Sequence, residues 1–121
     1  MSYEIKLVAL EFHAFHGVYD HETLAGNTFL LDLNVRFPLS RLPLEDKIEA
    51  APDYQILYRI AEEEMKMPSK LMETVALAIH KKIWKNFHEA IQVRVCIQKS
   101  NPPIGVPCKA SAVILESNEP F

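Results

Sequence analysis

The sequence predicts an α+β fold in which two helices cover one face of a four-stranded, mainly antiparallel sheet. Two strand-like segments precede two helix-like segments, and two more strand-like segments follow, in the order ββααββ. Each pair of strand-like segments is spaced like a hairpin, which favours antiparallel neighbours. The length of 121 residues fits one domain over residues 1–121, with no internal repeat or linker.

The first two strands are predicted on either side of a polar loop. Residues 3–15, "YEIKLVALEFHAF", combine alternation with a stronger apolar run and form the first strand. Gly17 and Gly26 bracket the loop. In residues 29–37, "FLLDLNVRF", apolar side chains alternate with Asp, Asn and Arg, which predicts a strand with one buried face.

Two helices follow a connection over residues 38–52 that contains three prolines. Asp53 is the expected N-cap of the first helix, which ends at "MKMPSK". Ser69 is the expected N-cap of the second helix. The apolar side chains of the second helix recur at helical spacing: Met72, Ala76, Ile79, Ile83 and Phe87.

The last two strands are predicted over residues 91–99, "IQVRVCIQK", and 109–116, "KASAVILE". In the former, Ile91 and every second residue to Ile97 share one face. So small a sheet has exposed edges, and closing them against other copies of the chain is one solution. We therefore expect a homo-oligomer.

Composition excludes several classes of function. The chain is 49% hydrophobic and 24% charged with a net charge of −3, which is typical of a globular protein and not of a nucleic-acid binder. We find neither a membrane span nor the pattern of a signal peptide, and we expect a cytoplasmic protein. Cys96 and Cys108 are expected to be free thiols.

Lys99 is the first candidate for chemistry. If the alternation of residues 91–97 continues, Lys99 projects on the apolar side, where a lysine needs a partner or a cavity. A lysine in such a place can act as an acid and a base near neutral pH. The alternative is a strand that ends at Gln98, with Lys99 in a solvated turn. Pro102 and Pro103 make the following loop rigid.

Glu73 and Tyr54 each open a predicted helix. Glu73 lies in the first turn of the second helix, where a carboxylate interacts favourably with the helix dipole, and that preference alone could explain it. Tyr54 follows the N-cap of the first helix and could be an ordinary surface aromatic.

The segment "FHAFHGVYDHE", residues 12–22, raises the question of a metal site. His13 and His16 are three residues apart on an extended segment, so they point to opposite faces and cannot hold one ion together. His80 and His88 are expected near the basic, solvated side of the second helix. No Cys-x-x-Cys or His-Glu-x-x-His spacing occurs, and we expect neither a metal nor a cofactor.

Four motifs, in order, resemble the dihydroneopterin aldolase family over about residues 5–116: "FHGVYDHE" with "GNTFLLDL", "DY" at the first helix, "KLMETVA", and "QKSNPPI". The resemblance implies the tunnelling fold, in which subunits join their sheets into a barrel, as a tetramer or octamer with active sites at subunit interfaces. It also implies an aldehyde-lyase of folate biosynthesis, which cleaves 7,8-dihydroneopterin without a metal and often epimerises it at the 2′ carbon.

The resemblance assigns roles to six residues. Lys99 matches the catalytic acid and base, Glu73 the carboxylate that binds the pterin ring, and Glu22 the loop acid near the hydroxylated tail. Leu71 and Met72 match positions whose backbone completes the ring pocket. Tyr54 matches a tyrosine that a neighbouring subunit contributes beside the reacting centre. The histidines of residues 12–22 would then be structural or exposed.

The chain departs from the family pattern at three places, and other functions remain open. Phe15 replaces a common tyrosine, Asp53 replaces an asparagine or histidine, and "IGVPCKAS" replaces a proline-glycine continuation after "NPPI". The alternatives are a dihydroneopterin triphosphate 2′-epimerase, a zinc-dependent pterin synthase of the same fold, and a pterin-binding oligomer without catalysis. The absence of Lys and Arg from residues 18–28 disfavours a triphosphate substrate.

Overall fold

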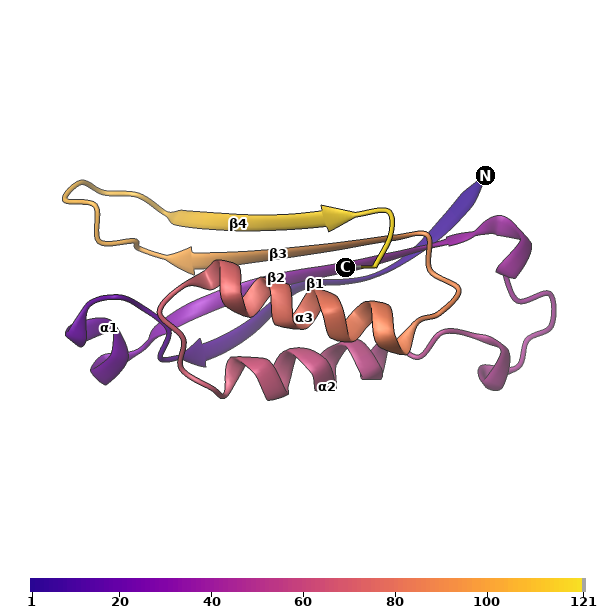
Figure 1. Cartoon of the computed structure of the whole chain (residues 1–121), viewed down its shortest axis with the longest axis horizontal. Helices are drawn as coiled ribbons and strands as arrows, with labels where there is room; N and C mark the ends of the chain where they lie inside the picture. The colour runs from indigo at the N-terminus through magenta and orange to yellow at the C-terminus, as the bar shows by residue number, and fades with distance from the viewer. Residues whose placement is uncertain (121) are drawn as a thin grey trace.

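The computed structural model describes residues 1–120, and its elements confirm the predicted α+β class (Figure 1). The strands are Ser2–Ala14 (β1), Asn27–Pro38 (β2), Gln92–Ser100 (β3) and Ala110–Ser117 (β4). The helices are Asp20–Ala25 (α1), Tyr54–Met65 (α2) and Met72–Asn86 (α3). Two short 3₁₀ turns, Leu39–Arg41 (η1) and Ile48–Ala50 (η2), lie in the connection between β2 and α2.

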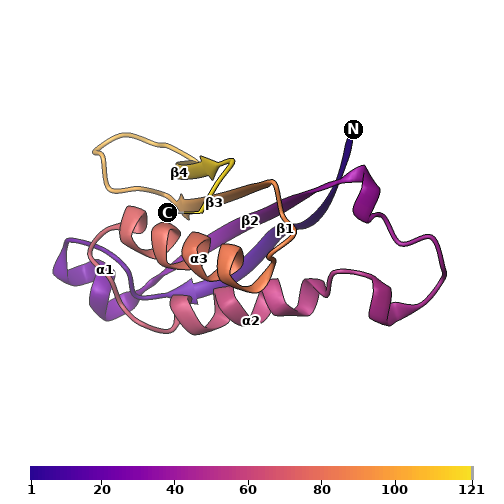
Figure 2. The ribbon, with the colours of Figure 1, turned by 45° about the vertical axis from the view of Figure 1, so that its right-hand side comes forward.

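The four strands form one antiparallel sheet in the order β1-β2-β3-β4, and α2 and α3 lie side by side over one face (Figure 2). The core lies between these layers because alternate residues of β2 and β3, such as Leu33 and Val95, face the helices and are fully buried. Ile91, predicted to share this face, instead precedes β3 and is exposed. Among residues 1–120, no helix has the length and apolar character needed to cross a membrane.

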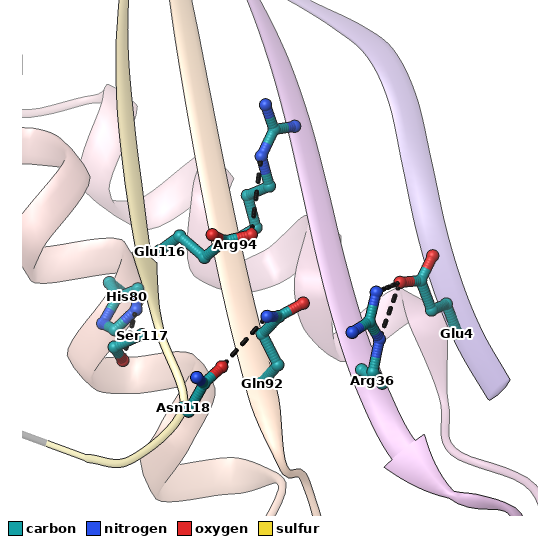
Figure 3. Close-up of polar contacts among 8 residues, drawn as sticks. All are labelled: Glu4, Arg36, His80, Gln92, Arg94, Glu116, Ser117 and Asn118. Carbon is teal, nitrogen blue, oxygen red and sulfur yellow. Dashed lines mark hydrogen bonds and ion pairs between the residues drawn. The ribbon is translucent and has the colours of Figure 1, made fainter. Parts of the chain in front are cut away.

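Polar cross-strand pairs line the other face of the sheet (Figure 3). Arg36 on β2 donates to Glu4 on β1 over 2.6 Å, and Arg94 on β3 lies 3.9 Å from Glu116 on β4. Such pairs satisfy charges on a face that no helix of the same chain covers. The two faces of the sheet therefore differ sharply in chemistry, as the alternation in the sequence predicts.

A β-bulge interrupts the pairing of β1 with β2. Leu7 pairs with Leu33 and Leu10 with Leu31, so that two residues, Val8 and Ala9, lie opposite Asp32 alone. Ala9 has a φ of 54°, and its N–H donates to Asp32 Oδ1 over 2.7 Å. The bulge explains why β1 mixes alternation with an apolar run: the inward positions shift by one residue after Leu7.

Residues 20–25 form helix α1 where the sequence predicts only a polar loop. The helix is six residues long, too short to produce a helical period in the sequence. Its start is stabilised by Glu22, whose Oε1 accepts the N–H groups of Val18 and Tyr19 over 3.2 and 3.3 Å. The predicted loop is therefore an ordered element, built around an acidic residue.

The predicted N-caps have different outcomes. Asp53 caps α2 as expected, because its side chain accepts the N–H of Gln55 over 2.9 Å. Ser69 does not cap α3: the N-cap position is Leu71, which makes no side-chain hydrogen bond there. The N–H of Ser69 instead donates to Nδ1 of His16 over 3.0 Å, a contact across 53 positions of sequence.

The expectation that His80 lies on the solvated side of its helix is wrong. His80 is fully buried, and its Nε2 lies 3.1 Å from Oγ of Ser117, which also accepts Nε1–H of Trp84 over 3.0 Å. Figure 3 shows His80 reaching from α3 to the end of β4. The imidazole therefore helps to join the second long helix to the edge strand.

Candidate active site

Lys99 and Glu22 form a buried ion pair at the end of β3. Lys99 is the penultimate residue of that strand and projects on the helix side, as alternation predicts. Its Nζ donates to Oε2 of Glu22, and the two side chains are 12% and 5% exposed. The alternative, in which Lys99 is a solvated turn residue, is therefore wrong. A charged hydrogen bond shielded from water is a suitable place for proton transfer.

Glu22 is held as a carboxylate in this pair. Burial raises the pKa of Glu22, but the hydrogen bonds from Lys99, Tyr19 and Val18 and the positive charge of Lys99 outweigh burial. The pKa therefore lies below its ordinary value. Since an ionised carboxylate can only accept, Glu22 fixes where the ammonium protons of Lys99 point.

Gly17 allows Glu22 to lie so close to the chain. A Cβ on Gly17 would meet Cβ of Glu22 at 2.4 Å and its Cδ and Oε1 at 2.7 Å, well inside contact distance. Any residue other than glycine at position 17 would therefore clash with Glu22. The "HG" in the sequence marks the point where backbone and acidic side chain meet.

The start of α3 lies at the same end of the molecule as the ion pair. Figure 1 shows α1, the end of β3 and the start of α3 gathered at the left of the view. Two hydrogen bonds join the segment before α1 to the segment before α3: the N–H of Gly17 donates to the carbonyl of Ser69 over 2.9 Å, and the N–H of Ser69 donates to His16. Leu71 and Glu73 are exposed and Met72 is half-buried, so a ligand can reach this turn.

Tyr54 lies apart from this cluster. It is the first residue of α2, which begins right of centre in Figure 1, on the side away from α1. The residue is 59% exposed, and with Leu7, Leu10 and Tyr58 it lines a shallow cavity of about 600 Å³. One copy of the chain therefore places five of the six predicted site residues at one end of the molecule, where Lys99 and Glu22 are in contact, and leaves Tyr54 outside.

The histidines of residues 12–22 have separate surroundings. His13 lies 3.1 Å from the carbonyl of Ala25 and joins β1 to α1. His16 is buried, whereas His21 is exposed and stacks on Tyr19 with ring centres 5.8 Å apart. The contact of His16 with Ser69 was not predicted, and no local pattern could predict it because the partner lies 53 positions away.

Comparison with known proteins gives one consistent result. The family model described as dihydroneopterin aldolase matches residues 5–116. A dihydroneopterin aldolase from Bacillus subtilis (strain 168) is 30% identical over 91% of this chain and 92% of its own length. An Escherichia coli dihydroneopterin aldolase in complex with neopterin has a similar fold, with a TM-score of 0.82 at 17% identity over 94% of this chain and 97% of that one.

A second solved structure agrees in fold. The dihydroneopterin aldolase of Burkholderia, solved with bound guanine, has a TM-score of 0.80 at 20% identity. The match covers 98% of this chain and 92% of that one.

Proposed function

This chain belongs to the dihydroneopterin aldolase family, and from that premise we propose how its own residues cleave 7,8-dihydroneopterin. The products are 6-hydroxymethyl-7,8-dihydropterin and glycolaldehyde, formed by a retro-aldol reaction of folate biosynthesis. The buried Lys99–Glu22 pair carries the proposal, because this reaction needs a proton shuttle beside a site that binds the ring.

The reaction breaks one carbon–carbon bond and moves protons at three atoms, which are the 2′-oxygen, the ring nitrogen and the 1′ carbon. A base removes the proton of the 2′-hydroxyl, the bond between the 1′ and 2′ carbons breaks, and glycolaldehyde leaves. The electron pair enters the C=N bond of the dihydropterin, whose ring nitrogen takes a proton. A proton is then delivered to the 1′ carbon, the ring nitrogen gives up its proton as the C=N bond re-forms, and the hydroxymethyl group is complete. The ring itself supplies the electron sink, so the protein must bind, orient and transfer protons.

Lys99 is the proposed acid and base, acting directly or through a water molecule. The carboxylate of Glu22 accepts one of its protons, which holds the ammonium group in one place. Glu22 is also the group proposed to meet the hydroxylated tail of the substrate. Because its carboxylate is already fixed by two backbone N–H groups, little reorganisation is needed when the tail binds.

Glu73 is the proposed ring-binding carboxylate. Pterins and guanine share an edge with a 2-amino group beside a ring N–H, and a carboxylate can accept both hydrogen bonds at once. Guanine and neopterin are the ligands of the two solved relatives, which supports this assignment. The exposed first turn of α3, with the backbone of Leu71 and Met72 beside it, leaves room for a flat ring.

The complete site is proposed to form between two copies of the chain. Tyr54 lies away from Lys99 within one copy, so a second copy would supply it. The unpaired edges of β1 and β4 support a barrel of joined sheets, as a tetramer or octamer. The unpaired Cys96 and Cys108 support a reducing, cytoplasmic location.

The test is to treat the purified protein with a chelator, incubate it with 7,8-dihydroneopterin and separate the pterin products. Hydroxymethyldihydropterin together with glycolaldehyde is the expected result, with some 2′ epimer from re-addition of the aldehyde. The 2′ epimer alone would favour an epimerase. A bound but unchanged pterin would favour a binding protein.

Variants assign the roles. Lys99→Ala should bind neopterin, followed by its fluorescence, but turn over at least roughly 100-fold more slowly. Glu73→Gln should weaken neopterin binding by roughly 100-fold, because an amide replaces one acceptor oxygen with a donor. Lys109→Ala removes an exposed lysine from the loop before β4 and is the matched control, expected to behave like the natural chain.

A further inference from the structure

His16 lies between the two halves of the site that one chain provides. It follows the end of β1, is 2% exposed, and packs edge-on against Phe29 with ring centres 5.3 Å apart. Phe29 is the residue of β2 that pairs with Lys99 on β3. A single side chain, that of Phe29, therefore links the imidazole of His16 to the position of Lys99 in the sheet.

Two hydrogen bonds join His16 and its neighbour to the segment before α3. The N–H of Ser69 donates to Nδ1 of His16 over 3.0 Å, and the N–H of Gly17 donates back to the carbonyl of Ser69 over 2.9 Å. The two bonds run in opposite directions between the same segments. We call this pair of bonds the His16–Ser69 clamp.

The clamp fixes the tautomer of His16. A backbone N–H can only donate, so Nδ1 must accept and the neutral ring carries its proton on Nε2. Nε2 is buried and has no hydrogen-bond partner among residues 1–120. Burial, followed by the charge of Lys99, lowers the pKa of His16, which agrees with a neutral ring.

The clamp joins two functional segments that lie far apart in the sequence. On one side, Gly17 leads into Val18 and Tyr19, whose N–H groups hold Glu22. On the other side, Ser69 leads into the first turn of α3, which contains Glu73 and lacks a side-chain cap at Leu71. The position of the ring-binding turn relative to the ion pair therefore depends on the clamp as well as on the packing of α3 against β3.

We propose that His16 is a positioning residue, whose Nδ1 sets the place of the Glu73 turn relative to the Lys99–Glu22 pair. This role rests on the proposed function. If the clamp is lost, Glu73 still binds the ring, but the tail of the substrate no longer lies correctly against the acid and base. Misplacement by about 1 Å can lower a rate by roughly 100-fold. The effect should therefore appear in kcat more than in KM.

Two substitutions separate the nitrogens of the ring. His16→Asn keeps an acceptor at the position of Nδ1, whereas His16→Gln places its polar group at the position of Nε2. We expect His16→Gln to lower kcat by roughly 10- to 100-fold with KM and the neopterin Kd within about threefold of the natural chain. His16→Asn should keep kcat within about threefold of the natural chain, because its acceptor alone restores the hydrogen bond from the N–H of Ser69.

Three results would overturn the proposal. These are natural turnover in His16→Gln, an equal loss of kcat in both variants, and a loss of neopterin binding that matches the loss of kcat. Nitrogen-15 NMR of the histidine rings in the natural chain tests the same idea without turnover or a folded variant. A proton on Nε2 of His16 supports the clamp, and a proton on Nδ1 excludes it. If the natural chain cleaves no dihydroneopterin, the proposed function fails, and NMR still decides whether the clamp exists.

Discussion

At the scale of single residues, the site depends on how closely backbone and side chains approach one another. Lys99 could be placed from the sequence because β3 is regular, and regular alternation extends to its end. Its partner could not be derived in the same way. Glu22 lies 77 positions away, on a helix too short to show a period. Only the family resemblance put the two residues in one site.

Gly17→Ala tests the close approach of Glu22. The added Cβ would lie 2.4 Å from Cβ of Glu22, so the carboxylate must move away from Lys99. We expect kcat for dihydroneopterin to fall by roughly 10- to 100-fold, with neopterin binding retained through Glu73. Gly105→Ala is the control for backbone strain without a clash, because Gly105 has a φ of 85° and no atom lies within 4 Å of the Cβ added there. Equal kcat values in the two variants would contradict the prediction.

His16 and His80 make stability sensitive to mild acid. Burial, together with Lys99 in the case of His16, lowers the pKa of both rings, and burial of His80 outweighs a hydrogen bond with the backbone of Val93. Below about pH 6.5 the unfolded chain binds protons that the folded chain does not. The free energy of unfolding should therefore be greatest above pH 6.5 and fall as the pH drops toward the folded pKa values.

Urea unfolding between pH 7.5 and 5.5, at fixed protein concentration, measures this loss. Each histidine contributes at most about 1.4 kcal/mol per pH unit. His80→Gln, which removes one titrating ring, should make the dependence shallower. His88→Gln changes an exposed ring and should leave it unaltered. An identical slope in all three proteins would show that the ring of His80 is not responsible.

At the scale of elements, regular periods were predictable and interruptions were not. The sequence predicts the buried face of β2 and the apolar stripe of α3 because the regular period of each element fixes which residues face the core. The bulge in β1 depends on Asp32 in another strand, and the true start of α3 depends on His16. Both are long-range hydrogen bonds, which leave no local pattern.

The bulge makes a prediction about stability. Ala9→Gly should raise the free energy of unfolding by roughly 0.5–1 kcal/mol, because glycine adopts a φ of 54° without the steric penalty of Cβ. Asp32→Ala should lower it by about 1–2 kcal/mol, because the N–H of Ala9 loses its acceptor.

Ala112→Gly, in the exposed part of β4, is the matched control for the bulge. It should lower stability, because glycine in an ordinary strand position loses more entropy on folding. Urea unfolding at equal protein concentration gives all three values. A loss of stability in Ala9→Gly would refute the prediction that the positive φ of Ala9 costs stability.

At the scale of the whole molecule, the separation of Tyr54 from Lys99 makes the proposed assembly testable. Tyr54→Ala and Lys99→Ala should each be nearly inactive alone. Unfolded together in equal amounts and refolded, they should recover about a quarter of natural activity, because random assembly gives that share of sites with both natural residues. Product formation per chain is the readout. No recovery in mixed oligomers, detected by mass, would exclude a site shared between copies.

The separation of Tyr54 from Lys99 within one chain has a consequence for how many shared sites can work. A contact that joins one surface to a different surface is head-to-tail, and such contacts either close into a ring or continue as a filament. An open chain of copies always ends in two half-sites, so it has one working site fewer than it has subunits. Only a closed ring gives every subunit a partner. Activity per chain should therefore rise steeply with concentration until rings close, and then become constant.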